Sequence, residues 1–164
     1  MSQQILIDGF AFARDGRLLE GRLPVARLGR LHDLLAEVSG EVRYRLQGVI
    51  GPLGRPQLWL DVEGDLSLSC QRCLEAVSHA LQIECVLELV PEGAELSQEE
   101  LEDDSKDFLP VAGQTDVVEL VEDEILLGLP VAPRHEDCGL PGSDEAGERV
   151  SPFAALAGMK SKPN

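Results

Sequence analysis

Apolar and polar residues alternate with a period of two along three stretches in the middle of the chain, the pattern of half-buried β-strands. The apolar positions are Val42, Tyr44, Leu46 and Ile50 in the first stretch, Leu58, Leu60, Val62, Leu66, Leu68 and Cys70 in the second, and Val77, Leu81, Ile83, Cys85, Leu87 and Leu89 in the third. Short turns with breaker residues, such as Gly51 and Pro52, join the stretches. We therefore predict an antiparallel β-meander with one buried face.

Two other stretches carry apolar residues at helical spacing. In residues 24–38 the apolar stripe consists of Val25, Leu28, Leu31, Leu35 and Val38. Proline suits a first helical turn and glycine suits a helix end, so Pro24 and Gly40 predict the limits of this helix. A second helix begins at Asp116, whose spacing to Glu119 resembles a capping box, and ends before Pro130. Both helices are expected to pack on one face of the sheet.

Residues 91–115 are expected to form an acidic, mobile loop. Between residues 91 and 113, eight acidic residues stand against a single basic one, Lys106. Repulsion among so many carboxylates disfavours packed structure and allows only a frayed helical turn near residues 96–101. The predicted fold is therefore α+β: one domain over residues 1–138, interrupted by this loop and followed by a tail.

Residues 139–164 are expected to form a flexible tail with a short docking helix at residues 152–160. The stretch 139–147 is rich in Gly, Pro and Glu, whereas apolar residues recur farther on at helical spacing after Ser151, a suitable N-cap. A two-turn helix is unstable alone and needs a surface. That surface is either its own domain or a groove on a partner protein. The candidate docking residues are Phe153, Leu156, Ala157 and Lys160.

The net charge of −16 is unevenly distributed along the chain. Residues 1–60 hold eight basic and six acidic residues, whereas residues 61–164 hold six basic and 24 acidic ones. The acidic surface either keeps the protein soluble or faces a basic partner, such as a ribosomal protein. Arg43 and Arg45 share the polar face of the predicted sheet and Arg72 lies in a turn, so these three are candidate RNA-binding residues.

Four cysteines and the absence of a signal sequence point to the cytoplasm, where thiols stay reduced or bind metal. Cys70 and Cys73 form a C-x-x-C motif, and His135 and Cys138 form a second pair of possible ligands. Together they are a plausible Cys₃His zinc set. Two alternatives stay open for the motif: a redox pair, or two reduced cysteines in a tight turn. Cys85 lies on the apolar face and is assigned to the core.

Signatures of catalysis and of membrane insertion are missing from the sequence. It contains no G-x-S-x-G, no phosphate-binding glycine loop and no H-E-x-x-H, and no run of about 18 apolar residues. We expect a protein that is not an enzyme, with no membrane segment and no small-molecule substrate. A metal-dependent nuclease is the least favoured alternative.

Three blocks of this sequence resemble the YceD family, in order and at matching separations. They are "SCQRCLE", "VEDEILLGLPVAPRHEDC" and "SPFAALAGMK", within a match that runs from Leu58 to Lys160. The resemblance implies a bacterial cytoplasmic factor needed for accumulation of large-subunit (23S) ribosomal RNA, through its synthesis, processing or stability. Its expected partner is a ribosomal protein or assembly factor of the large subunit, with direct rRNA binding as the alternative. Many relatives carry a second cysteine pair after the acidic helix, where this chain has His135 and Cys138.

Overall fold

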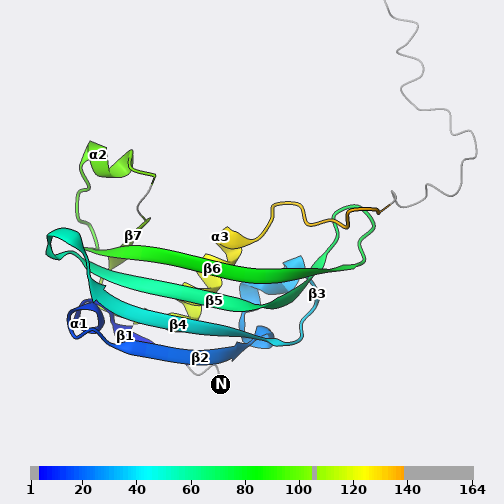
Figure 1. Ribbon diagram of the computed structural model, residues 1–164, viewed down its shortest axis with the longest axis horizontal. Helices are drawn as coiled ribbons and strands as arrows, with labels where there is room; N and C mark the ends of the chain where they lie inside the picture. The colour runs from blue at the N-terminus through cyan, green and yellow to red at the C-terminus, as the bar shows by residue number, and fades with distance from the viewer. Residues whose placement is uncertain (1–3, 105–106, 139–164) are drawn as a thin grey trace, which may run out of the picture.

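The computed structural model describes residues 4–104 and 107–138 and has a six-stranded sheet at its centre (Figure 1). The strand order is β2 (Leu18–Pro24), β4 (Glu41–Ile50), β5 (Pro56–Ser69), β6 (Ala76–Pro91) and β7 (Asp107–Val111), with β3 (Leu35–Glu37) paired to β5. All pairs are antiparallel except β6 and β7, which are parallel. The predicted α+β class and the β4–β5–β6 meander are confirmed.

Strand β5 shows how the alternating pattern builds the core. Its inward residues Leu58, Leu60 and Val62 are fully buried, whereas Trp59 between them is 47% exposed on the outer face. The pairing of β5 with β6 runs in register from Gln57 opposite Glu88 to Ser69 opposite Ala76. This long hairpin carries its turn well away from the middle of the sheet, and the turn holds the C-x-x-C motif.

Helix α3 (Val117–Gly128) lies across the inner face of the sheet, as predicted (Figure 1). Asp116 caps it by accepting a hydrogen bond from the Val118 backbone N–H at 2.9 Å. The helix buries Val121 and Ile125 completely, while Arg30 holds its buried residue Glu122 through two hydrogen bonds of 2.7 and 2.9 Å. No helix within the described residues is long and apolar enough to cross a membrane.

Strand β2 was not predicted, nor were a separate two-stranded sheet and the short helix that precedes β2. Strand β1 (Leu6–Asp8) pairs with β8 (Gln114–Asp116) in a separate two-stranded sheet, and helix α1 (Gly9–Arg14) follows β1 directly. Helix α1 packs closely on β4, because Gly48 offers no side chain there. A Cβ atom at Gly48 would lie only 2.2 Å from the carbonyl oxygen of Phe12.

The prediction of a helix over residues 24–38 is wrong. The chain instead forms two 3₁₀ turns, Val25–Arg27 and Gly29–Leu34, followed by β3. The apolar residues Val25, Leu28 and Leu31 are indeed fully buried, but their spacing of three suits the 3₁₀ helix as well as the α-helix. Leu28 has a non-helical ψ of 75°, so the two turns cannot merge into one helix.

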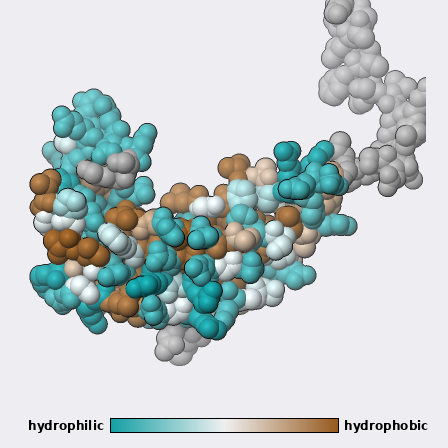
Figure 2. All heavy atoms as spheres, viewed as in Figure 1, coloured by the Kyte–Doolittle hydropathy of each residue, from teal (hydrophilic) through white to brown (hydrophobic). Residues whose placement is uncertain are grey.

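The acidic segment has more structure than the predicted loop. The expected helical turn is present as α2 (Gln98–Leu101), with a capping box between Ser97 and Glu100, whereas β7 was not anticipated. Arg55 ties this segment to the sheet by pairing with the buried Glu88 and, at 2.7 Å, with Glu100. The Ser97 backbone N–H and the Arg55 guanidinium lower the pKa of Glu100 to about 2. Figure 2 shows a hydrophilic surface around α2.

The predicted tail and docking helix lie outside the described residues. The same holds for their four candidate docking residues. These are Phe153, Leu156, Ala157 and Lys160. Their role therefore stays a prediction.

Candidate metal centre

The turn between β5 and β6 directs backbone N–H groups at a cysteine sulfur. Cys70 follows β5 and donates its N–H to the Glu75 carbonyl at 2.9 Å, while the Leu74 N–H donates to the Cys70 carbonyl at 3.0 Å. Leu74 has a φ of +65°, which is uncommon for a residue with a Cβ atom. In this tight turn the Arg72 N–H lies 3.5 Å from the Cys70 sulfur. Such donors stabilise a thiolate, the form that binds metal.

The segment that follows α3 returns to this turn (orange in Figure 1). The Gln71 N–H donates to the Pro133 carbonyl at 2.8 Å and aligns the two stretches of chain. Cys73 Sγ then lies 3.4 Å from His135 Nδ1. Cys70 Sγ lies 3.6 Å from Cys138 Sγ. The four ligands predicted from the sequence are thus brought together from positions more than 60 residues apart.

The size of the cluster fits a tetrahedral metal ion. Its four ligand atoms all lie within 4.8 Å of one another. Zn–S bonds of about 2.3 Å and Zn–N bonds of about 2.0–2.1 Å in tetrahedral geometry require S–S and S–N separations of about 3.8 and 3.6 Å. The two measured distances, 3.6 and 3.4 Å, lie close to these values. The cluster is therefore close enough and of the right composition to hold a metal ion.

The tautomer of His135 is the one that a metal ligand needs. Its Nε2 lies 2.9 Å from the Ala76 carbonyl oxygen. A carbonyl can only accept, so Nε2 carries a proton, and in the neutral imidazole the lone pair of Nδ1 is then directed at the Cys73 sulfur. Protein ligands are commonly oriented by such a bond from the second ring nitrogen. The Ala76 carbonyl also raises the pKa of His135.

The surroundings of the two C-x-x-C thiols favour ionisation of Cys70 and disfavour ionisation of Cys73 beside it. The Cys73 backbone N–H, acting against burial, lowers the pKa of Cys70 to about 5. The Glu75 N–H acts to lower the pKa of Cys73, but burial and the neighbouring Cys70 together raise it. A divalent cation between the sulfurs would remove this conflict, because each thiolate would then face a positive charge.

Cys85 takes no part in the cluster. It is half-buried among core residues, as the sequence predicted, and burial raises its pKa to about 12. The C-x-x-C itself joins two antiparallel strands, whereas a thioredoxin-like redox pair lies at the start of a helix. The fold thus offers no support for the redox alternative.

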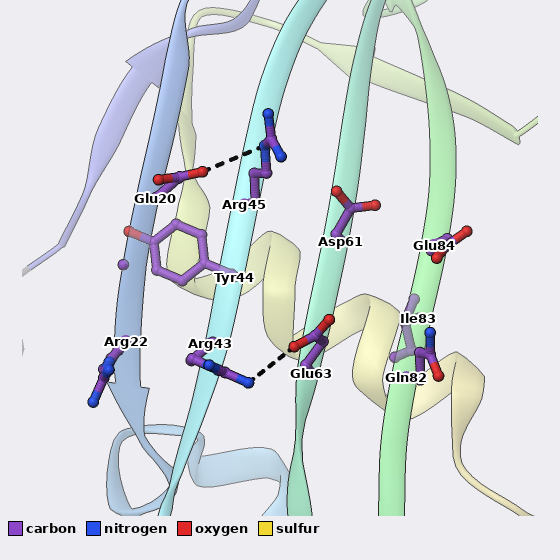
Figure 3. A pocket seen from close by; sticks show the side chains of 11 residues that line it. Glu20, Arg22, Arg43, Tyr44, Arg45, Asp61, Glu63, Gln82, Ile83 and Glu84 are labelled. Atoms are coloured by element: carbon purple, nitrogen blue, oxygen red, sulfur yellow. Dashed lines mark hydrogen bonds and ion pairs between the residues drawn. The ribbon is translucent and has the colours of Figure 1, made fainter.

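The outer face of the sheet holds two of the candidate RNA-binding arginines, and both are paired with carboxylates (Figure 3). Arg43 lies 3.0 Å from Glu63, and Arg45 lies 3.4 Å from Glu20. Arg72 is not on this face but in the cysteine turn, where its side chain is half-exposed. The three arginines therefore do not form one cluster.

A hollow of about 540 Å³ lies along this part of the sheet (Figure 3). Its charged lining residues are Arg22, Arg43, Arg45, Glu20, Asp61, Glu63 and Glu84. Four carboxylates thus outnumber three guanidinium groups. Such a surface does not present the positive field that phosphate groups require.

Sequence reasoning missed the backbone groups that build the metal centre. The carbonyls of Ala76 and Pro133 position His135 and its segment, yet every residue has a carbonyl, so the sequence carries no signal for them. The C-x-x-C turn itself was the only clue that Leu74 would adopt a positive φ.

Together, these features define an α+β protein with a candidate metal centre of four ligands, Cys70, Cys73, His135 and Cys138. The sequence profile described as "Large ribosomal RNA subunit accumulation protein YceD" matches residues 58–160. The chain therefore belongs to the YceD family. It is 27% identical over 150 residues to the "Large ribosomal RNA subunit accumulation protein YceD" of Haemophilus influenzae, with 83% of each chain covered. No solved structure shows a significant match.

Proposed function

We propose that this protein is a non-enzymatic, cytoplasmic factor required for the accumulation of large-subunit ribosomal RNA, through its synthesis, processing or stability. The observation that carries the proposal is the family match over residues 58–160, which includes β5, β6, α3 and all four candidate metal ligands. The Haemophilus influenzae protein, which matches this chain over 83% of its own length, has the same description. A closed ligand set supports a structural role, because it leaves no coordination position for a substrate.

The surface charge supports a basic protein partner of the large subunit, a ribosomal protein or an assembly factor, over direct contact with RNA. The chain carries a net charge of −16, and its sheet arginines are paired with carboxylates. Asp61 and Glu84 lie opposite each other in register on β5 and β6. Like charges in this arrangement are unfavourable, and basic side chains of a partner would relieve them. Beside them, Trp59 and Val86 are 47% and 44% exposed and add apolar contact area.

We propose zinc as the metal of the Cys70, Cys73, His135 and Cys138 cluster. Three thiolates and one imidazole are ligands that zinc prefers, and the fold brings the three sulfur atoms and the ring nitrogen within 4.8 Å of one another. Zinc would supply no reaction chemistry here. It would join the β5–β6 turn to the chain that follows α3.

Deletion of the gene tests the proposed function. We expect the ratio of large-subunit to small-subunit rRNA to fall, and to recover when the wild-type gene is restored. Precursor rRNA measured in the same cells separates a processing defect from reduced synthesis. An unchanged ratio in the deletion strain would refute the function.

A charge-reversal experiment distinguishes the protein partner from RNA. In the Arg43→Glu/Arg45→Glu variant, we expect large-subunit proteins to co-purify as they do with the wild type, because both arginines already pair with carboxylates. Their recovery should survive RNase and be lost from a chain ending at Gly147, which lacks the predicted docking helix. If RNase or the double substitution abolishes recovery, the RNA-binding alternative replaces the protein partner.

A further inference from the structure

The segment that carries His135 and Cys138 buries very little apolar surface against the domain. None of residues 131–138 is buried, and only Pro133, His135 and Cys138 are half-buried. Val131 is fully exposed. Burial of apolar surface is the main force that holds irregular segments on a domain, and here it is nearly absent.

Hydrogen bonds do not make up for this missing burial. The described contacts of the segment include two hydrogen bonds to the turn, from Gln71 N–H to the Pro133 carbonyl and from His135 Nε2 to the Ala76 carbonyl. Each contributes little net free energy, because water competes for the same groups. Fixing the backbone of every residue in the segment, in contrast, costs conformational entropy. A further interaction is needed, and the four ligands provide the only strong one that the described residues offer.

We propose that zinc at the Cys70, Cys73, His135 and Cys138 cluster acts as a clasp that orders residues 131–138 against the β5–β6 turn. The inference rests on the zinc site proposed above and adds a conformational role to it. Metal binding then orders the segment, as coupled binding and folding does in small zinc domains.

The clasp acts locally, because the neighbouring elements are secured independently. Helix α3 buries Val121 and Ile125 completely and is held by the Arg30–Glu122 ion pair at 2.9 Å. Strands β5 and β6 pair continuously from Gln57 opposite Glu88 to Ser69 opposite Ala76. Loss of the metal should therefore release the segment and leave the sheet and α3 folded, a case of local unfolding.

The clasp has a consequence for the proposed partner. The family match continues through residue 160, so the residues beyond Cys138 belong to the family region. With the clasp closed, the predicted docking residues follow a fixed Cys138; with the clasp open, they follow a segment released from residue 131 onward. Closing the clasp removes residues 131–138 from the released stretch and so raises the effective concentration of the predicted docking residues at a partner bound to the domain. Metal occupancy would thus set how strongly the domain and the predicted docking residues bind the same partner together.

Trypsin cleavage after Arg134 tests the clasp on the full-length chain. Arg134 is exposed but lies between the Pro133 hydrogen bond and the ligand His135. We expect slow cleavage in the zinc-loaded wild type and cleavage faster by about tenfold or more in His135→Ala, as local opening predicts. His135→Cys should retain both zinc and protection, because it restores a four-ligand set. Mass spectrometry of the peptides that end at Arg134 gives the rate.

Cleavage after Arg43 and Arg45 in β4 serves as the internal control, because it reports unfolding of the sheet. Metal content is measured on the same samples. If the wild type binds no stoichiometric zinc, the zinc site itself fails. If zinc binds but Arg134 is cut equally fast with and without it, the clasp is refuted while the zinc site stands. Faster cleavage at Arg43 and Arg45 in His135→Ala would also refute a local clasp.

Discussion

Replacing Cys73 with serine is expected to abolish stoichiometric zinc binding. A serine hydroxyl stays protonated at neutral pH, so the site loses one of its three thiolates, the one whose sulfur lies 3.4 Å from His135 Nδ1. Loss of an outer-shell partner alone lowers metal affinity by about 10- to 100-fold, so loss of a direct ligand should cost about a hundredfold or more. Competition with a chromogenic chelator measures the affinity, and metal analysis of the purified protein gives the stoichiometry.

The matched control for this variant is Cys85→Ser. Cys85 is also a half-buried thiol, but it lies under α3 and contacts none of the four ligands. It should retain zinc, and a Co²⁺-substituted sample should keep the intense visible absorption of tetrahedral thiolate coordination. Equal zinc binding by the wild type and Cys73→Ser, or loss of zinc from Cys85→Ser, would contradict the assigned ligand set.

Gly48→Ala is expected to produce the largest loss of stability among single methyl additions to the sheet. The new Cβ would lie 2.2 Å from the Phe12 carbonyl oxygen and 2.7 Å from the Ala13 Cα, both backbone atoms that cannot rotate away. Helix α1 would have to shift off β4, exposing Phe12, which is 2% exposed in the wild type. Overpacking of this kind costs about 3 kcal/mol. Urea unfolding followed by circular dichroism gives the free energy of unfolding.

Gly29→Ala is the control for the methyl group itself. No heavy atom lies within 4 Å of a Cβ built on Gly29, and its φ is not positive. The free energy of unfolding should change by about 0.5 kcal/mol or less. If Gly48→Ala is as stable as Gly29→Ala, the close packing of α1 on β4 is not correct.

The elements with a long, regular pattern were predictable from the sequence. In β4, β5 and β6 the alternation continues over many residues, and the buried face follows it at Leu46, Leu60 and Leu87. Helix α3 has both a cap and an apolar stripe. In such stretches the local sequence preference and the tertiary packing favour the same secondary structure, so the sequence pattern alone predicts it.

The remaining elements lack such a pattern. Strands β1 and β8 have three residues each, too few for a period, and are held by pairing across the whole domain. Strand β7 lies in a segment whose charge suggested a loop, yet parallel pairing with β6 satisfies the backbone groups along one side of it. Between Val25 and Leu31, a spacing of three did not separate a 3₁₀ helix from an α-helix.

The metal ligands were predictable because C-x-x-C and H-x-x-C each place two donors at one turn. That the two pairs would meet depended on the segment after α3 returning to the hairpin, which only the fold shows. The pairing of Arg45 could not be predicted for a related reason. Its partner Glu20 lies on β2, a strand that was not predicted, so Glu20 was not expected beside it.

The pairing of β1 with β8 means that the domain can complete its folding only late in its synthesis. Ile5 and Asp116, which are 111 residues apart, are joined by a hydrogen bond, and the Val117 N–H donates to the Ile5 carbonyl. At translation rates of about 5–20 residues per second, the first strand waits roughly 5–20 seconds for its partner. Until residues 114–116 have left the ribosome, β1 has no strand to pair with, and α3 lacks the Asp116 cap at which it begins. The nascent chain is therefore unfinished for most of its translation, and a message truncated before this point yields a sheet without its closing pair.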